Sequence, residues 1–317
     1  MAKSGSLEGK LVVLLGGSGF VGRHLAQDLL ERGARLRIAS RHPEKAYKLK
    51  PLANLGQISF ARCDAEQPES VAAVMQGADA AVYLIGAFKG DLDALQAESA
   101  GIAAAAAKQA GATAFVLVSA IGADAEAETA YARTKGKGEA AVLKAFPKAT
   151  VLRPSVLFGE DDNFINMFAG LVSTMPVLPI FGPDCELQPL WVDDAAEAIG
   201  NALSDPGTHG GKIYEIGGPE VLTMGRINRM IATAQQREKI FLEMPDVASA
   251  IFAALPLTPM NRDQWAMLKQ GSAVPGKLPG LKQLGITPKP LELFLDKWMV
   301  RYRKHGRFGT DISAVKR

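Results

Sequence analysis

Tyr131 and Lys135 are four residues apart, a spacing that places two side chains on one face of a helix. A free phenol has a pKa of about 10, which suits proton exchange at neutral pH poorly. A nearby ammonium stabilises the phenolate and lowers that pKa, so the pair could protonate the alkoxide that hydride transfer to a carbonyl leaves. Ser119 could hydrogen-bond the carbonyl oxygen. We therefore predict Ser119, Tyr131 and Lys135 as catalytic residues. The alternative is a tyrosine and a lysine on a helix surface with no shared task.

Such chemistry needs a bound nicotinamide, and the amino-terminal residues contain a candidate site for one. Seven residues, Gly16-Gly17-Ser18-Gly19-Phe20-Val21-Gly22, follow an apolar run and open an amphipathic stretch. In a strand–turn–helix unit, one glycine makes the turn, one lets the backbone approach a pyrophosphate, and one packs helix on strand. The helix N-terminus also favours an anion. This pattern predicts a dinucleotide held by Gly16, Ser18, Gly19, Phe20, Val21 and Gly22, with a plain turn as the alternative.

The residues after the second apolar run indicate which dinucleotide binds. An NAD site usually has an acidic residue there for the ribose hydroxyls, but none occurs between Glu31 and Glu44. Arg41 stands in that place instead and can pair with a 2′-phosphate, assisted by Lys45 one helical turn on. We therefore predict NADP(H) in preference to NAD(H). The alternative for Arg41 is a solvated surface arginine.

Two further residues follow predicted strands. Asp64 is placed to meet the adenine amino group, and Gly86 leaves room for the cofactor, although turn chemistry alone could explain either residue. Cys63 and Cys185 have no metal-ligand spacing and form no Cys-x-x-Cys motif. We expect two reduced thiols and no metal site.

Short apolar runs alternate with helical patterns over the first two thirds of the chain, which predicts an α/β fold with a Rossmann doubly wound parallel sheet. Residues 212–216 look like a further strand of this sheet, after a stretch rich in proline and glycine. We predict a dinucleotide-binding domain over 8–155 and 186–218, and a smaller C-terminal α/β lobe for substrate or partner over 156–185 and 219–317. The expected strands are Leu11–Leu15, Leu36–Ala39, Ile58–Ala61, Ala80–Ile85, Ala114–Ser119 and Thr150–Leu152.

Composition narrows the class of protein. The 317 residues are 48% hydrophobic and 22% charged, which is ordinary for a globular protein and excludes a collagen, a disordered chain or a disulfide scaffold. No apolar stretch reaches the length of a membrane span, and the run after Lys10 is too short for a signal peptide, so we expect a cytoplasmic protein. The basic residues are not interleaved with stacking aromatics, so we expect no binding of nucleic acid.

These motifs together resemble the short-chain dehydrogenase/reductase superfamily in its extended or atypical branch. The resemblance rests on Gly16–Gly22, Ser119, Tyr131-x-x-x-Lys135, Leu152–Gly159 and Trp191–Ala196. It implies that Pro154 borders the nicotinamide. More narrowly, the strings Val118–Asp124, Tyr131–Glu139 and Phe158–Phe164 resemble bacterial relatives of the NADPH-binding accessory subunit of respiratory complex I. One departure is Leu15, where many extended members have threonine.

The narrower resemblance implies a bound NADPH with a largely structural role, complex I subunits as partners, and a peripheral place on the inner face of the respiratory membrane. Two alternatives stay open: an active NADPH-dependent reductase of a small lipophilic carbonyl or quinone-pathway intermediate, and a nucleotide-sugar epimerase. Leu291, Leu295, Trp298 and Tyr302 share one face of a basic helix near the end of the chain. That helix could lie on a membrane surface or pack on its own domain.

Overall fold

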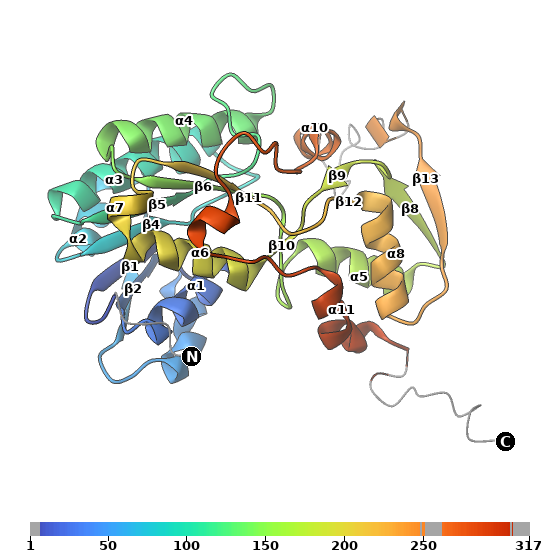
Figure 1. The fold of residues 1–317 in the computed structure, drawn as a ribbon, viewed down its shortest axis with the longest axis horizontal. Coiled ribbons are helices and arrows are strands. Elements are labelled where there is room, and N and C mark those ends of the chain that lie inside the picture. The colour runs from blue at the N-terminus through green and yellow to red at the C-terminus, as the bar shows by residue number, and fades with distance from the viewer. Residues whose placement is uncertain (1–6, 248, 251–261, 305, 307–317) are drawn as a thin grey trace. The chain divides into compact units, whose positions relative to one another are not determined.

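Seven parallel strands lie side by side in the order β3-β2-β1-β4-β5-β6-β11 in the computed structural model (Figure 1). The order reverses between β1 and β4, where an open α/β sheet has its crevice for ligands. The Rossmann-type doubly wound sheet expected from the sequence is therefore confirmed. The strands are β1 (Leu11–Leu15), β2 (Arg35–Ser40), β3 (Ile58–Arg62), β4 (Ala80–Tyr83), β5 (Ala114–Val118), β6 (Thr150–Pro154) and β11 (Ile213–Ile216).

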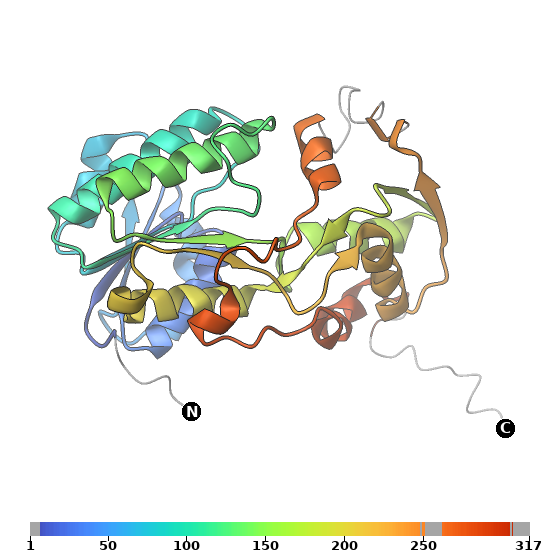
Figure 2. The ribbon, with the colours of Figure 1, turned by 45° about the horizontal axis from the view of Figure 1, so that its top comes forward.

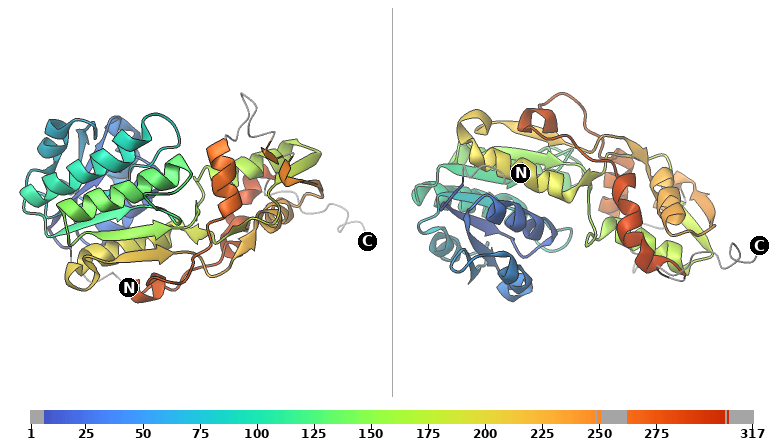
Figure 3. Two further views of the ribbon diagram at one scale, coloured as in Figure 1. Left: turned by 90° about the horizontal axis from the view of Figure 1, so that it is seen from above. Right: turned by 60° about the horizontal axis from the view of Figure 1, so that its bottom comes forward.

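Helices cover both faces of this sheet, as Figures 1 and 2 show. One face packs against α2 (Pro68–Met75), α3 (Ser99–Gln109) and α4 (Ala130–Ala145), whose apolar residues share one core with the strands. Figure 3 shows α3 and α4 side by side. The other face carries α1 (Phe20–Glu31) and α6 (Val192–Ser204). The other helical elements of unit 1 are η1 (Pro43–Leu52), η2 (Asp93–Glu98), α7 (Pro206–His209) and η3 (Leu281–Leu284).

The chain divides into two compact units, and the structure describes residues 7–247, 249–250, 262–304 and 306. Unit 1 comprises Met1–Pro154, Val192–Ile216 and Val274–Thr287, and it contains the seven-stranded sheet. Unit 2 comprises Ser155–Trp191, Gly217–Ala273 and Pro288–Arg317. The end of the predicted C-terminal lobe, 307–317, lies outside the described residues.

The division differs from the predicted one mainly in two places. Residues 186–191 were expected beside the large sheet, but they form β9 (Glu186–Leu187) and β10 (Leu190–Trp191), which pair with strands of unit 2. Residues 274–287 were expected in the lobe but belong to unit 1. These residues lie along the edge of the large sheet, where the Glu215 N–H of β11 donates to the Pro279 carbonyl at 3.0 Å.

Unit 2 is an α/β unit of short strand pairs and helices around one apolar core. β7 (Leu157–Phe158) pairs with β10, β12 (Leu222–Thr223) with β9, and β8 (Val177–Phe181) with β13 (Ile240–Met244). Its core holds Phe158, Ile165, Leu178, Ile227 and Leu295 among others. The helices are α5 (Phe164–Thr174), α8 (Met224–Ala234), α10 (Arg262–Gln270), α11 (Glu292–Met299) and the single turn η4 (Val300–Tyr302).

The basic helix near the end of the chain packs within unit 2. Three of the four residues of its predicted apolar face are buried, with Leu291 and Leu295 each 3% exposed and Trp298 4% exposed, and Tyr302 is partly buried against the same core. Phe294, from the same helix, stacks on Trp191 with ring centroids 3.9 Å apart. These aromatic side chains contribute to the core, so they are not available as membrane anchors.

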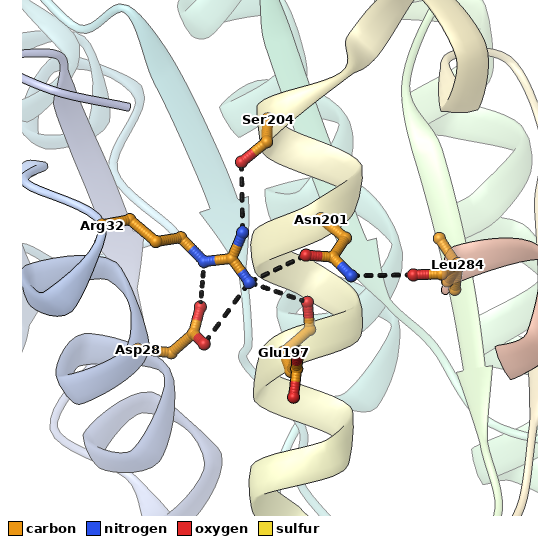
Figure 4. A network of polar contacts seen from close by, with 6 residues as sticks. All are labelled: Asp28, Arg32, Glu197, Asn201, Ser204 and Leu284. Carbon is orange, nitrogen blue, oxygen red and sulfur yellow. Dashed lines mark hydrogen bonds and ion pairs between the residues drawn. The ribbon is translucent and has the colours of Figure 1, made fainter. Parts of the chain in front are cut away.

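A buried ion pair joins α1 to α6 on one face of the sheet (Figure 4). Arg32 donates from Nε to the Asp28 carboxylate at 2.6 Å, and both side chains are almost fully buried. The other guanidinium nitrogens of Arg32 reach α6 and donate to Asn201 at 2.8 Å and to Ser204 at 3.3 Å. Asn201 donates in turn to the Leu284 carbonyl at 2.7 Å, so the network also fixes η3.

We expect Arg32→Met to lower the free energy of unfolding by about 3–5 kcal/mol, because the Asp28 carboxylate then stays buried without its guanidinium. The double variant Asp28→Leu, Arg32→Met should regain most of that loss, since neither charge remains buried. Urea unfolding measures both values. Arg35→Met, at an exposed arginine, is the control and should change stability by no more than about 0.5 kcal/mol. A similarly small effect of Arg32→Met would show that the pair contributes little.

Candidate functional site

A pocket of about 330 Å³ lies at the carboxyl ends of β1, β2, β3 and β4 in unit 1. Its walls are the turns that follow these four strands, together with Leu95 from η2. Parallel strands end at the same edge of a sheet, so residues far apart in sequence meet there. Among the predicted cofactor residues, this pocket brings together Gly16, Ser18, Gly19, Arg41, Lys45, Asp64 and Gly86.

The turn between β1 and α1 depends on glycine at two positions for reasons visible in the backbone. Gly16 has a φ of +80°, a left-handed conformation that side chains disfavour. A Cβ on Gly22 would lie 2.5 Å from the Gly17 Cα, so α1 and the turn touch backbone to backbone. This contact brings the first turn of α1 to the edge of the sheet.

The residues at this end of the pocket fit a dinucleotide pyrophosphate. Gly19 is the N-cap residue of α1, and no side chain accepts a hydrogen bond from the first turn of this helix as a cap. N–H groups of that turn therefore remain available to an anion. A Cβ on Gly19 would contact only the Gly16 carbonyl oxygen within 4 Å, so the space beside this glycine is open. Ser40 lines the same pocket, and its buried hydroxyl has no hydrogen-bond partner among the described residues.

Charge is arranged unevenly around the pocket. Arg41 and Lys45 line it after β2, and both are exposed. Asp64 is the carboxylate among the lining residues, and it lies after β3, where one of its oxygens accepts the Glu66 N–H at 3.2 Å. Glu44 is not among the lining residues and contacts His42 at 3.2 Å. The end of β2 is therefore a cationic part of the site.

The three predicted catalytic residues lie at the end of β5 and on α4. Ser119 is buried, and its hydroxyl has no hydrogen-bond partner among the described residues. Lys135 donates from Nζ to the Val118 carbonyl at 3.1 Å and to the Ile85 carbonyl at 3.4 Å. Ile85 lines the pocket, so the hydrogen bond from Lys135 connects α4 to the pocket wall that follows β4.

Burial moves the pKa values of the pair in opposite directions. Desolvation raises the pKa of Tyr131 to about 12 and lowers the pKa of Lys135 to about 8, against a smaller opposing effect of Glu139 on the lysine. The Lys135 Nζ lies 5.9 Å from the centre of the Tyr131 ring. Phe88 stacks on that ring, with centroids 4.7 Å apart. At neutral pH, Tyr131 is therefore a neutral phenol that can donate a proton, and Lys135 is mostly charged.

Four predicted cofactor residues do not line this pocket. Phe20, Val21 and Gly22 belong to the first turn of α1 beside it, and Pro154 ends β6, where its carbonyl accepts the Ile121 N–H at 3.1 Å. Other lining residues were missed. Five of them lie at or just after strand ends, and that position could have identified them from the sequence: Ser40, His42, Cys63, Ala65 and Ile85. Nothing in the sequence indicated Leu95.

The described residues contain no cluster of three metal-ligating side chains and no helix long and apolar enough to span a membrane.

Comparison with known proteins agrees with this fold and with a domain that binds a nicotinamide dinucleotide. Residues 16–164 match a family described as NAD(P)H-binding, and residues 122–273 match one described as the RmlD substrate binding domain. NADH dehydrogenase (ubiquinone) 1 alpha subcomplex subunit 9 of Arabidopsis thaliana mitochondria is 29% identical over 97% of this chain and 82% of its own length. Ceramide reductase of Caulobacter vibrioides is 30% identical over 60% of this chain and 59% of its own length.

A solved structure shows the same fold. Triphenylmethane reductase from Citrobacter superposes with a TM-score of 0.73 at 17% identity, covering 91% of this chain and 99% of its own. With the matches in sequence, the fold and the glycine turn show that the chain is related to the atypical short-chain dehydrogenases/reductases, and that unit 1 is a domain for a nicotinamide dinucleotide. Over nearly its whole length it resembles subunit 9 of mitochondrial NADH dehydrogenase, so the narrower resemblance is confirmed as well.

The lowered pKa of Lys135 predicts how stability depends on pH. A lysine in the unfolded chain titrates near 10.5, above its value of about 8 in the folded protein. Between these values the unfolded chain holds the proton that the folded one has released, so this group raises stability as pH rises. From pH 7 to pH 10, the wild type should gain about 2 kcal/mol relative to Lys135→Met.

Urea unfolding of both proteins across this pH range measures the difference. Lys137→Met, at an exposed lysine of the same helix, is the matched control and should follow the wild type. Parallel pH curves for the wild type and Lys135→Met would contradict the altered titration.

Proposed function

We propose that the pocket of unit 1 binds NADP(H) in preference to NAD(H). The observation that carries the proposal is the end of β2, where Arg41 and Lys45 line the pocket and Glu44 does not. A carboxylate there would repel a 2′-phosphate, whereas a guanidinium forms charge-assisted hydrogen bonds with it. Gly16, Ser18, Gly19 and the first turn of α1 would hold the pyrophosphate. Asp64 would meet the adenine, and Gly86 leaves space beside β4.

Arg41→Ala should weaken NADPH binding about 10- to 100-fold, because a charge-assisted hydrogen bond to the 2′-phosphate is lost. Binding of NADH, which lacks that phosphate, should change little. Calorimetric titration of each coenzyme measures the dissociation constants. Arg35→Ala, at the opposite end of β2, is the control and should leave both constants unchanged. Equal affinity of the wild type for the two coenzymes contradicts the assignment.

For the whole chain, we propose the role of an accessory subunit associated with respiratory complex I, with a cofactor that is mainly structural. The near full-length similarity to subunit 9 of mitochondrial NADH dehydrogenase supports this association. The properties of Tyr131 and Lys135 also support a coenzyme that is bound mainly for structure. Tyr131 has a pKa of about 12, far from a general base at neutral pH, and Lys135 donates to two backbone carbonyls. The expected location is the inner face of the respiratory membrane, as a peripheral protein.

Purification from membranes of the source cells tests this role. The tagged chain should copurify with NADH:ubiquinone oxidoreductase activity after mild solubilisation and carry NADPH that ubiquinone does not oxidise. The variant Gly22→Leu, which cannot pack α1 against Gly17, should lose both the coenzyme and the association. Purification of the wild type free of that activity would contradict the accessory role and leave the coenzyme assignment standing.

The second candidate is an active reductase of a small lipophilic carbonyl compound. Ser119 favours it, since its buried hydroxyl is without a partner among the described residues and could hydrogen-bond a carbonyl oxygen. A bound nicotinamide would supply the hydride. The Tyr131 hydroxyl would then donate its proton to the resulting alkoxide, and the Lys135 ammonium would stabilise the phenolate. The similarity to a ceramide reductase, which is named for a lipid, supports this class of substrate.

Under this second candidate, Tyr131→Phe should reduce NADPH oxidation with a lipophilic ketone or quinone by about 10²- to 10⁴-fold while NADPH binding stays unchanged, because only the proton donor is removed. Spectrophotometric assay of the reduced nicotinamide, with separate calorimetry, distinguishes the two effects. If the wild type shows no oxidation above background, or if Tyr131→Phe is as active as the wild type, the catalytic role is excluded.

A further inference from the structure

A group of basic and apolar side chains on unit 1 takes no part in the pocket described above. It consists of residues from η1 and the turn after it, namely Tyr47, Lys48, Lys50, Leu52 and Leu55, which we call the η1 patch. None of the five lines the cofactor pocket. η1 is anchored on unit 1 by its other face, since Ala46 and Leu49 are buried. The patch is therefore a surface whose exposure needs its own explanation.

The apolar members of the patch are exposed to solvent. Tyr47 is 46% exposed, Leu52 is 52% exposed, and Leu55 is fully exposed at the tip of the turn. This turn is held in place, because Gln57 donates from Nε2 to the carbonyls of Leu30 and Ala34, each at 3.1 Å. The two leucines are thus presented on an anchored turn next to the helix.

The segment 33–62, which contains the η1 patch, has mostly basic residues among its charged residues. Between Arg32 and Cys63, Glu44 is the single acidic residue, and it contacts His42 rather than a lysine. Lys50 lies over the Tyr47 ring at 4.0 Å from its centre, and Tyr47 packs edge-on against Phe60. In a 3₁₀-helix, residues three apart share a face, so Tyr47 and Lys50 project together while Lys48 occupies the next face.

We propose, building on the peripheral location proposed above, that the η1 patch binds the surface of a bilayer that contains anionic phospholipids. Lysines bind headgroup phosphates, tyrosine suits the interface, and exposed leucines enter the edge of the acyl region. An acidic protein would complement the lysines, but it would leave the two projecting leucines in water or need matching apolar pockets. A lipid surface accommodates both classes of side chain. The sequence left open whether the helix that contains Trp298 lies on a membrane surface or packs on its own domain, and the structure buries its aromatic face in unit 2.

Flotation of the full-length protein with vesicles tests the proposal. The wild type should bind vesicles of phosphatidylcholine with phosphatidylglycerol, should bind pure phosphatidylcholine vesicles weakly, and should be released by high salt. Lys48→Gln, Lys50→Gln should weaken binding about fivefold for each lysine removed. Leu52→Ser, Leu55→Ser should weaken it at low salt, where the lysines still act. Arg41 and Lys45 are unchanged in these variants, so NADPH affinity and the melting temperature should stay at wild-type values.

Leu293→Ser is the matched control, since Leu293 is 56% exposed on α11 of unit 2. It should bind vesicles like the wild type. The proposal is overturned if the wild type does not float with anionic vesicles, if it binds neutral vesicles equally well, or if both double variants bind normally. Loss of binding in Leu293→Ser alone would place the contact on α11 and would also overturn it. Because NADPH binding is measured separately, none of these outcomes bears on the coenzyme assignment.

Discussion

The contact between Gly22 and Gly17 is the constraint on which the dinucleotide site depends. A Cβ at Gly22 would lie 2.5 Å from the Gly17 backbone, so any side chain there would push α1 away from the end of β1. With glycine, the uncapped first turn of α1 comes to the carboxyl edge of the sheet, where its N–H groups can meet a pyrophosphate. Arg41, Asp64 and Gly86 reach the same edge from the next strands. The turn therefore fixes one end of the pocket, and the neighbouring strands supply the rest of its wall.

The electrostatics of the residues at the end of β5 and on α4 follow from their burial. Burial keeps Tyr131 protonated and makes the charge on Lys135 costly, as their pKa values of about 12 and about 8 express. Lys135 offsets part of that cost by donating to the carbonyls of Ile85 and Val118. A lysine engaged in this way supports the wall of the pocket.

The rest of unit 1 shows how the scaffold keeps this edge rigid. Arg32 and Asp28 join α1 to α6 through a network that reaches η3 (Figure 4). Gly200 makes the crossing possible, since a Cβ there would lie 2.3 Å from an Asp28 oxygen. A functional turn at one end of α1 is thus supported by a structural ion pair toward its other end. The Asp28–Arg32 pair and Gly200 do not line the pocket, but both fix the direction of α1.

Local sequence determined the positions of the strands of the large sheet, the glycine turn and the shared helix face of Tyr131 and Lys135, because alternation of apolar runs and backbone sterics act over a few residues. Tertiary structure decided the strand order, the assignment of 274–287 to unit 1, the burial of Trp298 and the direction of the pKa shifts. It also added Ser40 and Leu95 to the pocket. These features depend on contacts and desolvation between residues far apart in sequence, which no local pattern encodes.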